Sequence, residues 1–382
     1  MGSHLVIVDG LLAGFLLISR ILSRLRPDRR LPPGPKGIPV LGNIFDFPPP
    51  GVPEFEHWLH HKDTYGPISS VTVLGQTAVI IHDVEAARHI LDKESKFTSG
   101  RPRLEFAQDL CGFGKSLASM QNNHTLREHR RIVHQQIGTP ARAAHYDDML
   151  EMEIRRFLLQ LLQSPENITE QIMTAMSAII LRMTYGYSIR TSQPDPLVTL
   201  IERMMSNFSM ASVPMTWLVD IIPAIKLLPS WLPGMSFKEK ARVWNNVTHA
   251  ATEIPYAFVK KQLAGKRHQP SYVASLLERP NGGQKQEPPD EEAIKWTAAT
   301  LYGAGADTTS GTLSFFILAM VNFPEVQRKA QEELDRVIGP GKLPRLADRG
   351  KLAYIEAVLK EAHRWCPVGP MGFAHMSDQD IF

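Results

Sequence analysis

Apolar residues recur at spacings of three and four along most of this chain, which is the pattern of an amphipathic helix with one buried face. The pattern predicts helices over residues 83–94, 147–162, 168–183, 196–208, 238–265, 291–322, 324–339 and 352–365. No repeat of fixed period links these segments, so they do not describe a repeat array. The sequence therefore predicts a mainly helical protein.

One short region has a different pattern. Residues 67–83, PISSVTVLGQTAVIIHD, contain two runs of β-branched residues on either side of a turn around Gly75. Two such runs joined by a short glycine-containing turn are typical of a β-hairpin. The predicted fold class is therefore mainly α with a small N-terminal β region.

The N-terminus is strongly apolar. Residues 5–22 hold few polar side chains, and a cluster of arginines follows them within residues 20–30. A spanning helix needs about 20 apolar residues, and a cleaved signal peptide would carry its positive charges before the apolar run. We expect a single-pass membrane anchor within residues 1–30, with the remaining chain on the cytosolic side. A buried N-terminal helix is the alternative.

Prolines follow the basic run. Pro32, Pro33, Pro35 and Pro39 exclude a helix and favour an extended path. We interpret residues 31–50 as a semi-rigid hinge between the anchor and one large domain over residues 51–382. Within that domain, residues 279–292 are rich in proline, glycine and charge, which predicts an exposed loop.

Charge and cysteine content exclude several classes of protein. The 42 basic residues nearly balance the 39 acidic ones, and the net charge of +3 gives no case for nucleic acid as a partner. Only two cysteines are present, which excludes a disulfide framework and a multi-cysteine zinc site.

An apolar stretch over residues 212–235 is broken by four prolines. In a membrane-anchored protein such a connection could enter the lipid interface or cover the entrance for a lipophilic ligand. Ordinary core packing explains it equally well, and the sequence does not separate these interpretations.

The longest predicted helix contains the segment LYGAGADTTSGT. Glycine is unfavourable inside a helix, but small side chains at Gly303, Ala304 and Gly305 would let a flat partner approach the backbone. Asp307 and Thr308 follow, an acid beside an alcohol that can relay protons to a bound oxygen species. In the alternative interpretation, the glycines serve helix packing and the threonines bond back to main-chain carbonyls.

A second constellation lies near the C-terminus. Glu361 and Arg364 are three residues apart on the last predicted helix, which has an apolar side in the segment LAYIEAVL. Most such pairs are solvated surface contacts. The apolar neighbours favour partial burial here, and a buried pair would have a structural role.

Taken in order, the anchor, PPGPKGIPVLGN, the hairpin, REHRR, AGADTTS and EAHRWCP resemble a cytochrome P-450 of the membrane-bound fungal kind. These proteins are haem-thiolate monooxygenases, and the resemblance covers nearly the whole chain. It implies heme b as cofactor, an NADPH-cytochrome reductase as partner and a lipophilic small molecule as substrate. It also implies attachment to the endoplasmic reticulum, and we expect a role in fungal secondary metabolism.

The resemblance also assigns residues. It implies that Ala304 and Gly305 face the haem and that Asp307 and Thr308 deliver protons for oxygen-bond cleavage. By the same resemblance, the helix containing Arg127 and Arg130 meets the haem propionates, and Glu361 with Arg364 forms a buried pair that supports the haem core. Leu126 stands where the family usually has a tryptophan.

The iron ligand of the family is a cysteine in a loop of the type Phe-x-x-Gly-x-x-x-Cys-x-Gly, and residues 1–382 contain no such loop. Cys366, which precedes a proline, and Cys111 do not match it. We therefore expect an incomplete haem-monooxygenase domain that lacks its C-terminal haem-ligand region and has no axial metal ligand. The alternative function is a non-catalytic relative, such as a membrane-anchored helical binding protein.

Overall fold

The computed structural model describes residues 31–39, 41–49, 51–189, 194–278 and 289–381. They form two compact units, one that runs up to Gly100 and includes Ala374–Phe382, and one that comprises Arg101–Phe373. That residues 51–382 form one large domain stays a prediction. No helix in the described ranges is both long and apolar enough to cross a membrane. The expected anchor, residues 1–30, lies outside the described residues, as does most of the loop predicted over 279–292.

The first unit contains the predicted hairpin. Strands β1 (Ile68–Val73) and β2 (Gln76–Ile81) pair antiparallel, with Val73 opposite Gln76. The two turn residues, Leu74 and Gly75, have φ of 49° and 82°, as a tight two-residue hairpin turn requires. The other elements of this unit are α2 (Glu54–Tyr65), α3 (Val84–Arg88), the π-helical η1 (His89–Lys93) and α4 (Ser95–Thr98). The helix predicted over 83–94 is therefore divided, because its second half is wound as a π-helix.

The proline-rich segment lies beside the hairpin. It is hydrogen-bonded to β1, because the Ser70 N–H donates to the Pro33 carbonyl at 2.9 Å. A Cβ added at Gly34 would lie 1.9 Å from the Ser70 carbonyl oxygen. The described residues of this segment are therefore part of the first unit, and the description of residues 31–50 as a hinge to the anchor stays a prediction.

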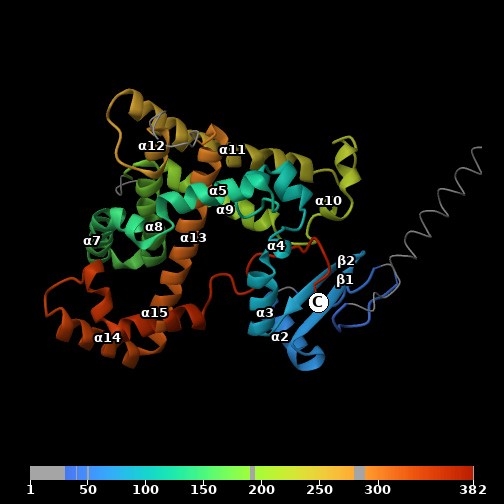
Figure 1. Cartoon of the computed structure of the whole chain (residues 1–382), viewed down its shortest axis with the longest axis horizontal. Helices are drawn as coiled ribbons and strands as arrows, with labels where there is room; N and C mark the ends of the chain where they lie inside the picture. The colour runs from blue at the N-terminus through green and yellow to red at the C-terminus, as the bar shows by residue number, and fades with distance from the viewer. Residues whose placement is uncertain (1–30, 40, 50, 190–193, 279–288, 382) are drawn as a thin grey trace, which may run out of the picture. The chain divides into compact units, whose positions relative to one another are not determined.

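The second unit is helical, and Figure 1 labels its main elements. Its long helices are α5 (His124–Ile137), α7 (Asp147–Gln163), α8 (Ile168–Tyr185), α9 (Pro196–Ala211), α11 (Phe237–Ala264), α13 (Glu291–Asn322), α14 (Pro324–Val337) and α15 (Ala353–Trp365). Its short elements are η2 (Glu105–Leu110), η3 (Phe113–Lys115), α6 (Pro140–Ala143), η4 (Ala144–Tyr146), η5 (Pro165–Asn167), α10 (Leu218–Ile221), η6 (Pro223–Leu227), α12 (Tyr272–Leu277) and η7 (Leu346–Lys351). The mainly helical fold with a small N-terminal sheet is confirmed.

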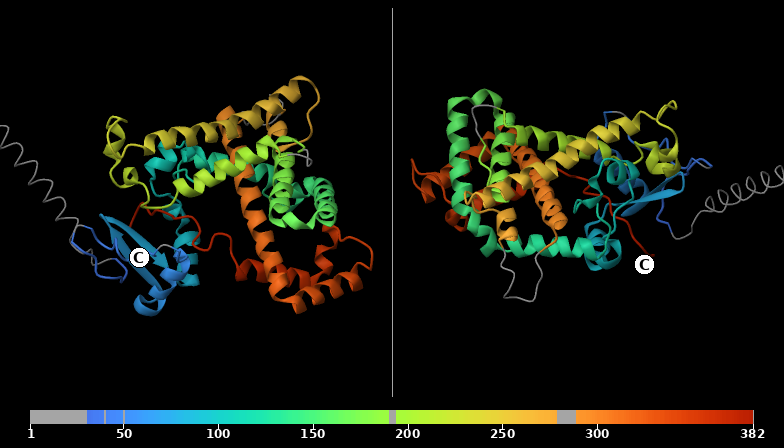
Figure 2. Two further views of the ribbon diagram at one scale, coloured as in Figure 1. Left: turned by 180° about the vertical axis from the view of Figure 1, so that it is seen from behind. Right: turned by 90° about the horizontal axis from the view of Figure 1, so that it is seen from above.

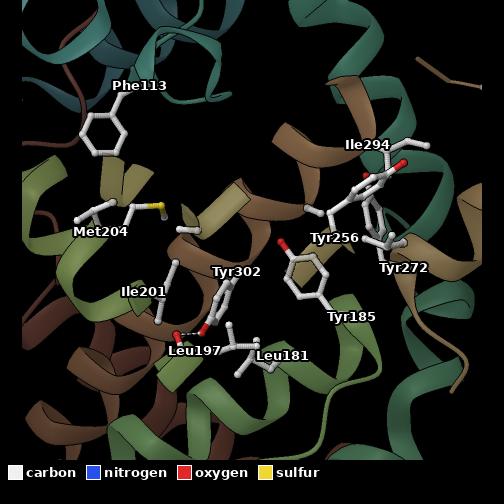
Figure 3. Packing of buried hydrophobic residues seen from close by; sticks show 14 of the residues in the cluster. Phe113, Leu181, Tyr185, Leu197, Ile201, Met204, Tyr256, Tyr272, Ile294 and Tyr302 are labelled. Carbon is white, nitrogen blue, oxygen red and sulfur yellow. Dashed lines mark hydrogen bonds between the residues drawn. The ribbon is translucent and has the colours of Figure 1, made fainter. Parts of the chain in front are cut away.

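Helix α13 packs against most of the long helices of this unit. It packs against α8, α9, α11, α5 and α15, and Figure 2 shows it running between them toward α14. Tyrosines fill the core around it: the Tyr302 hydroxyl donates to the Leu197 carbonyl at 2.6 Å, and the Tyr272 hydroxyl to Thr297 at 2.8 Å. Figure 3 shows Tyr185 between these two tyrosines. Burial of the three rings stabilises the helical core, and the hydroxyl groups of Tyr272 and Tyr302 are hydrogen-bonded.

Candidate functional site

The glycines of α13 pack against two different helices. A Cβ at Gly303 would lie 2.7 Å from Met205 Sδ on α9, and a Cβ at Gly305 would lie 2.7 Å from Ile180 Cδ1 on α8. Both glycines therefore permit close helix packing, as the alternative interpretation of this segment predicted. Ala304, between them, is exposed and faces away from this packing. That Ala304 and Gly305 together meet a haem stays a prediction.

Thr308 lies one turn beyond Ala304 and is also exposed. Its hydroxyl donates to the Ala304 carbonyl at 2.8 Å, so the expected back-bonding of threonine is present. Asp307 is half-buried, and burial raises the pKa of its carboxyl group. No hydrogen bond to the Asp307 carboxylate is found among the described residues. A carboxyl group with a raised pKa thus stands beside an alcohol on an accessible face, which is chemically suitable for proton transfer.

Helix α5 presents Arg127 and Arg130 on its exposed side, and its first turn is capped by Asn123, whose side chain accepts from the Leu126 N–H at 3.0 Å. Leu126, at the position expected for tryptophan, is fully buried at 1% exposure. It therefore fills the core and would offer no polar group to a ligand.

Arg101 is a residue that the sequence reasoning missed. It is partly buried, and burial followed by the charge of Arg130 lowers the pKa of its guanidinium group. Its Nη1 donates to the Phe373 carbonyl at 3.1 Å, and the Gln121 side chain donates to its carbonyl at 2.7 Å. Two guanidinium groups held near each other repel, and an anion between them would relieve the repulsion. No spacing in the sequence signals this approach.

Glu361 and Arg364 form the predicted pair, with Arg364 Nε 2.8 Å from Glu361 Oε2. The side chains are 59% and 70% exposed, however, so the prediction of a buried pair is wrong for this structure. The buried residues of α15 are Val358 and Ala362, and they turn its apolar face toward the other helices. The pair lies on the opposite side, where no described segment covers it.

The two cysteines lie in different surroundings, and the expected absence of an axial ligand stays a prediction. Cys111 is fully buried, and burial with the nearby charge of Asp220 raises the pKa of its thiol to about 12, so it stays protonated at neutral pH. Cys366 ends α15, and its N–H donates to the Ala362 carbonyl at 3.2 Å. The described residues contain no group of three or more metal-ligating side chains.

The candidate residues nevertheless come from helices that meet. Both α5 and α15 contact α13. The segment after α15 returns to α13, because a Cβ at Gly311 would lie 3.3 Å from a methyl group of Val368. Gly311 is about two helical turns beyond Ala304. Helix α13, which carries the acid and the alcohol, is thus in contact with the helix that carries the arginines and with the segment that follows α15.

Comparison with known proteins defines the class of this protein. The family model described as Cytochrome P450 matches residues 32–382, and the chain belongs to that family. Its relatives include the multifunctional cytochrome P450 monooxygenase af510 of Aspergillus fumigatus, 49% identical over 92% of this chain and 67% of the relative. Cytochrome P450 monooxygenase CLM2 of Gibberella zeae is also 49% identical, over 92% of this chain and 67% of that protein.

A more distant relative extends the comparison. O-methylsterigmatocystin oxidoreductase of Aspergillus flavus is 36% identical over 98% of this chain and 71% of its own length. The chain thus spans roughly two thirds of the length of these fungal relatives. The family implies haem as its cofactor and a reductase as its partner.

Proposed function

We propose that this chain carries the proton-delivery and propionate-binding parts of a haem monooxygenase that inserts one oxygen atom from O2 into a lipophilic small molecule. The fungal relatives suggest a role in secondary metabolism. The single observation that carries the proposal is the exposed face of α13, where Ala304 and Thr308 lie one turn apart beside half-buried Asp307. A flat ligand can approach such a face, and the raised pKa of Asp307 moves its carboxyl toward the range of a general acid.

The cofactor fits this chain in part. A haem held by a cysteine thiolate activates dioxygen by favouring cleavage of the oxygen–oxygen bond. Arg130 and Arg127 on α5 would bind the haem propionates through charge-assisted hydrogen bonds, with Arg101 adding a second guanidinium beside Arg130. Cys111 does not fit the axial position, because it is a buried thiol that keeps its proton at neutral pH. No catalytic step is therefore assigned to either cysteine.

The partners follow from the same proposal. Electrons would come from NADPH through a reductase, and the exposed arginines of α5 are suited to an acidic protein surface. The apolar N-terminal segment would attach the protein to the endoplasmic reticulum membrane with both compact units on the cytosolic side. The apolar stretch over residues 212–235 has Leu227 and Trp231 at 81% and 80% exposure, which supports contact with lipid or a lipophilic ligand.

Haem titration of the full chain in a neutral detergent tests the propionate assignment. We expect a saturable change in the Soret band, and we expect Arg130→Gln to weaken haem binding by about tenfold through loss of one charge-assisted contact. Arg328→Gln on α14, an arginine that is 70% exposed, is the matched control and should change nothing. Equal effects of the two substitutions would contradict the assignment.

A second candidate function is favoured by the state of the cysteines. A chain without a thiolate donor would bind haem or a lipophilic ligand without turnover. Reduction under carbon monoxide separates the two functions, because only thiolate ligation gives the strongly red-shifted band. If that band appears and persists in Cys366→Ser, an axial thiolate other than Cys366 is present. If no such band forms although haem binds, the non-catalytic function is favoured for this chain.

A further inference from the structure

A small cavity of about 180 Å³ lies in the second unit, where the end of α8 meets the end of α11 and the connection from α11 to α12. Helices α8, α11 and α12 contact one another in this part of the unit (Figure 1). Phe258, Val259 and Gln262 of α11 line one side of the cavity, and residues 267–269 of the connection line another. Pockets for drug-sized ligands measure about 300–1,000 Å³, so a ligand of this cavity must be smaller.

Main-chain contacts fix the walls of the cavity. Gly186, which ends α8, has a φ of 65°, and a Cβ added there would lie 3.0 Å from the Gln269 carbonyl oxygen. Glycine therefore permits the close approach of the connection to α8. On the other side, the Arg267 N–H donates to the Gln262 carbonyl at 3.0 Å, which ties the connection to α11. The residues that line the cavity are thus held in place without a ligand.

His268 contributes a polar atom that has no partner. Its Nε2 lies 2.9 Å from Glu278 Oε1. A carboxylate only accepts hydrogen bonds, so Nε2 carries the hydrogen and Nδ1 of the neutral ring is an acceptor. Nδ1 is buried, and no described residue donates to it. Because an unpaired buried acceptor is unfavourable, a ligand that brings a donor to Nδ1 would be stabilised there, and the negative charge of Glu278 favours a cationic donor.

Arg267 has the opposite requirement. Its side chain is exposed, and no carboxylate among the described residues pairs with it. The planar guanidinium group matches a carboxylate through two parallel hydrogen bonds. The cavity therefore has an acceptor at His268 and a cation at the preceding residue. Phe258 and Val259 add an apolar wall, and the ring of Phe258 is packed edge-on against Tyr187 with centroids 5.2 Å apart.

We propose that this cavity binds a free α-amino acid with a small apolar side chain. The carboxylate of the ligand pairs with Arg267, its ammonium group donates to His268 Nδ1, and its side chain contacts Phe258 and Val259. An organic acid alone would leave Nδ1 unpaired, and an amine alone would leave Arg267 unpaired. None of the candidate residues for haem lines the cavity, so the site does not rest on the proposed reaction.

The test is a calorimetric titration of the full chain with L-valine in a neutral detergent, together with hydrogen exchange of residues 258–269. We expect saturable binding with protection of this segment. Two analogues each lack one charge: 3-methylbutanoate has no ammonium group, and 2-methylpropylamine has no carboxylate. Each should bind about tenfold more weakly than L-valine, because one charge-assisted contact is lost. Equal affinity for L-valine and 3-methylbutanoate would overturn the amino acid as ligand.

A substitution separates the contact with Arg267 from a general effect of charge. Arg267→Gln should weaken binding of L-valine by about tenfold and leave binding of 2-methylpropylamine unchanged, so that the two affinities become similar. Lys261→Gln, at an exposed position on α11 that does not line the cavity, is the matched control and should change neither affinity. The absence of saturable L-valine binding would overturn the site. Equal losses in the two variants would overturn the assignment of the carboxylate to Arg267.

Discussion

Glu153 and Glu361 each have an arginine three residues further along the chain, yet the two pairs lie in different surroundings. Glu153 is 3% exposed and contacts Arg156 at 3.0 Å and Arg182 of α8 at 2.6 Å. Glu361 is 59% exposed and contacts only Arg364 among the described residues. The same spacing in the sequence thus gives one buried interhelical network and one surface pair.

Substitution by glutamine should separate these pairs. Glu153→Gln leaves two arginines without their buried counter-charge, and we expect it to lower the free energy of unfolding by about 2 kcal/mol. Glu361→Gln should leave the melting temperature of this chain almost unchanged, because solvent screens an exposed pair. Thermal melts of both variants measure the difference. A loss for Glu361→Gln as large as that for Glu153→Gln would contradict the observed exposure.

Asp220 is a buried carboxylate, and its contribution to the free energy of unfolding depends on pH. Its Oδ1 accepts the Phe106 N–H at 2.8 Å, while Oδ2 is buried without a partner. Burial raises its pKa to about 6. The folded state therefore binds this proton more tightly than the unfolded state, so the stability contributed by the group is present at low pH and falls as pH rises toward 6.

Asp220→Asn keeps the acceptor for Phe106 but removes the buried charge. We expect it to stabilise the protein by about 1–3 kcal/mol at pH 7.5, and to have a smaller effect at pH 4.5, where the penalty has only begun because the unfolded aspartate ionises at about pH 3.9. Melting temperatures at the two pH values measure this. Asp335→Asn, at an exposed position on α14, is the control and should show no such pH-dependent gain.

At the scale of elements, α14 holds the start of α15. The carboxylate of Glu333 accepts the Tyr354 and Ile355 N–H groups at 3.0 Å each. These are donors of the first turn of α15, which would otherwise lack partners. The hydrogen bonds lower the pKa of Glu333, with that from Tyr354 contributing most. The stabilisation is thus present at neutral pH and is lost as pH falls through the lowered pKa.

Glu333→Gln should therefore lower the melting temperature at neutral pH, because a neutral side chain accepts these hydrogen bonds less strongly. The difference from the unsubstituted protein should shrink as pH falls below about 4. The neighbouring Glu332 is 68% exposed, so Glu332→Gln is the control. If the two variants lost stability equally, the helix-capping role of Glu333 would be ruled out.

Sequence patterns predicted the helices and the hairpin well, because these elements are set mainly by residues that are close in the sequence. Apolar periodicity predicted α13 over 291–322 with the observed bounds, and the hairpin turn was predicted from Gly75. Contacts between residues that are far apart in the sequence could not be predicted in this way. Glu105 and Lys226 meet although they are 121 residues apart, and Arg101 comes near Arg130 only because two segments fold together. The exposure of Glu361 likewise depends on which segments cover α15, which periodicity does not encode.

At the scale of the whole molecule, each compact unit contains buried or half-buried titrating groups. Acidification changes the stability of the two units in opposite directions through these groups. In the first unit, the buried Ser69 hydroxyl lies 3.1 Å from both His61 Nδ1 and His82 Nε2. Burial, followed by the charges of His57 and His82, lowers the pKa of His61 against a smaller opposing effect of Asp46. Burial and the charge of Lys62 lower that of His82. These histidines favour the neutral state, so their stabilisation is lost as pH falls below about 6.5.

Acidification from pH 7.5 to 5.5 should therefore weaken the first unit, whereas Asp220 acts in the opposite direction in the second. Hydrogen exchange, resolved by segment and corrected for intrinsic rates, measures the stability of each unit at both pH values. His82→Gln should reduce the acid sensitivity of residues 54–82, while His60→Gln, at an exposed position on α2, should not. Equal acid sensitivity in these two variants would contradict the role of the histidines that contact Ser69.

Gly303 and Gly305 of α13 differ in how easily the neighbouring side chains could move to accommodate a larger residue. An added methyl group at Gly303 would meet the sulfur of Met205, which can rotate about several bonds. One at Gly305 would meet three atoms of Ile180, whose branched side chain is stiff. In an alignment of related chains, alanine at position 305 should therefore occur together with a smaller residue at position 180, whereas position 303 should vary with little regard to position 205.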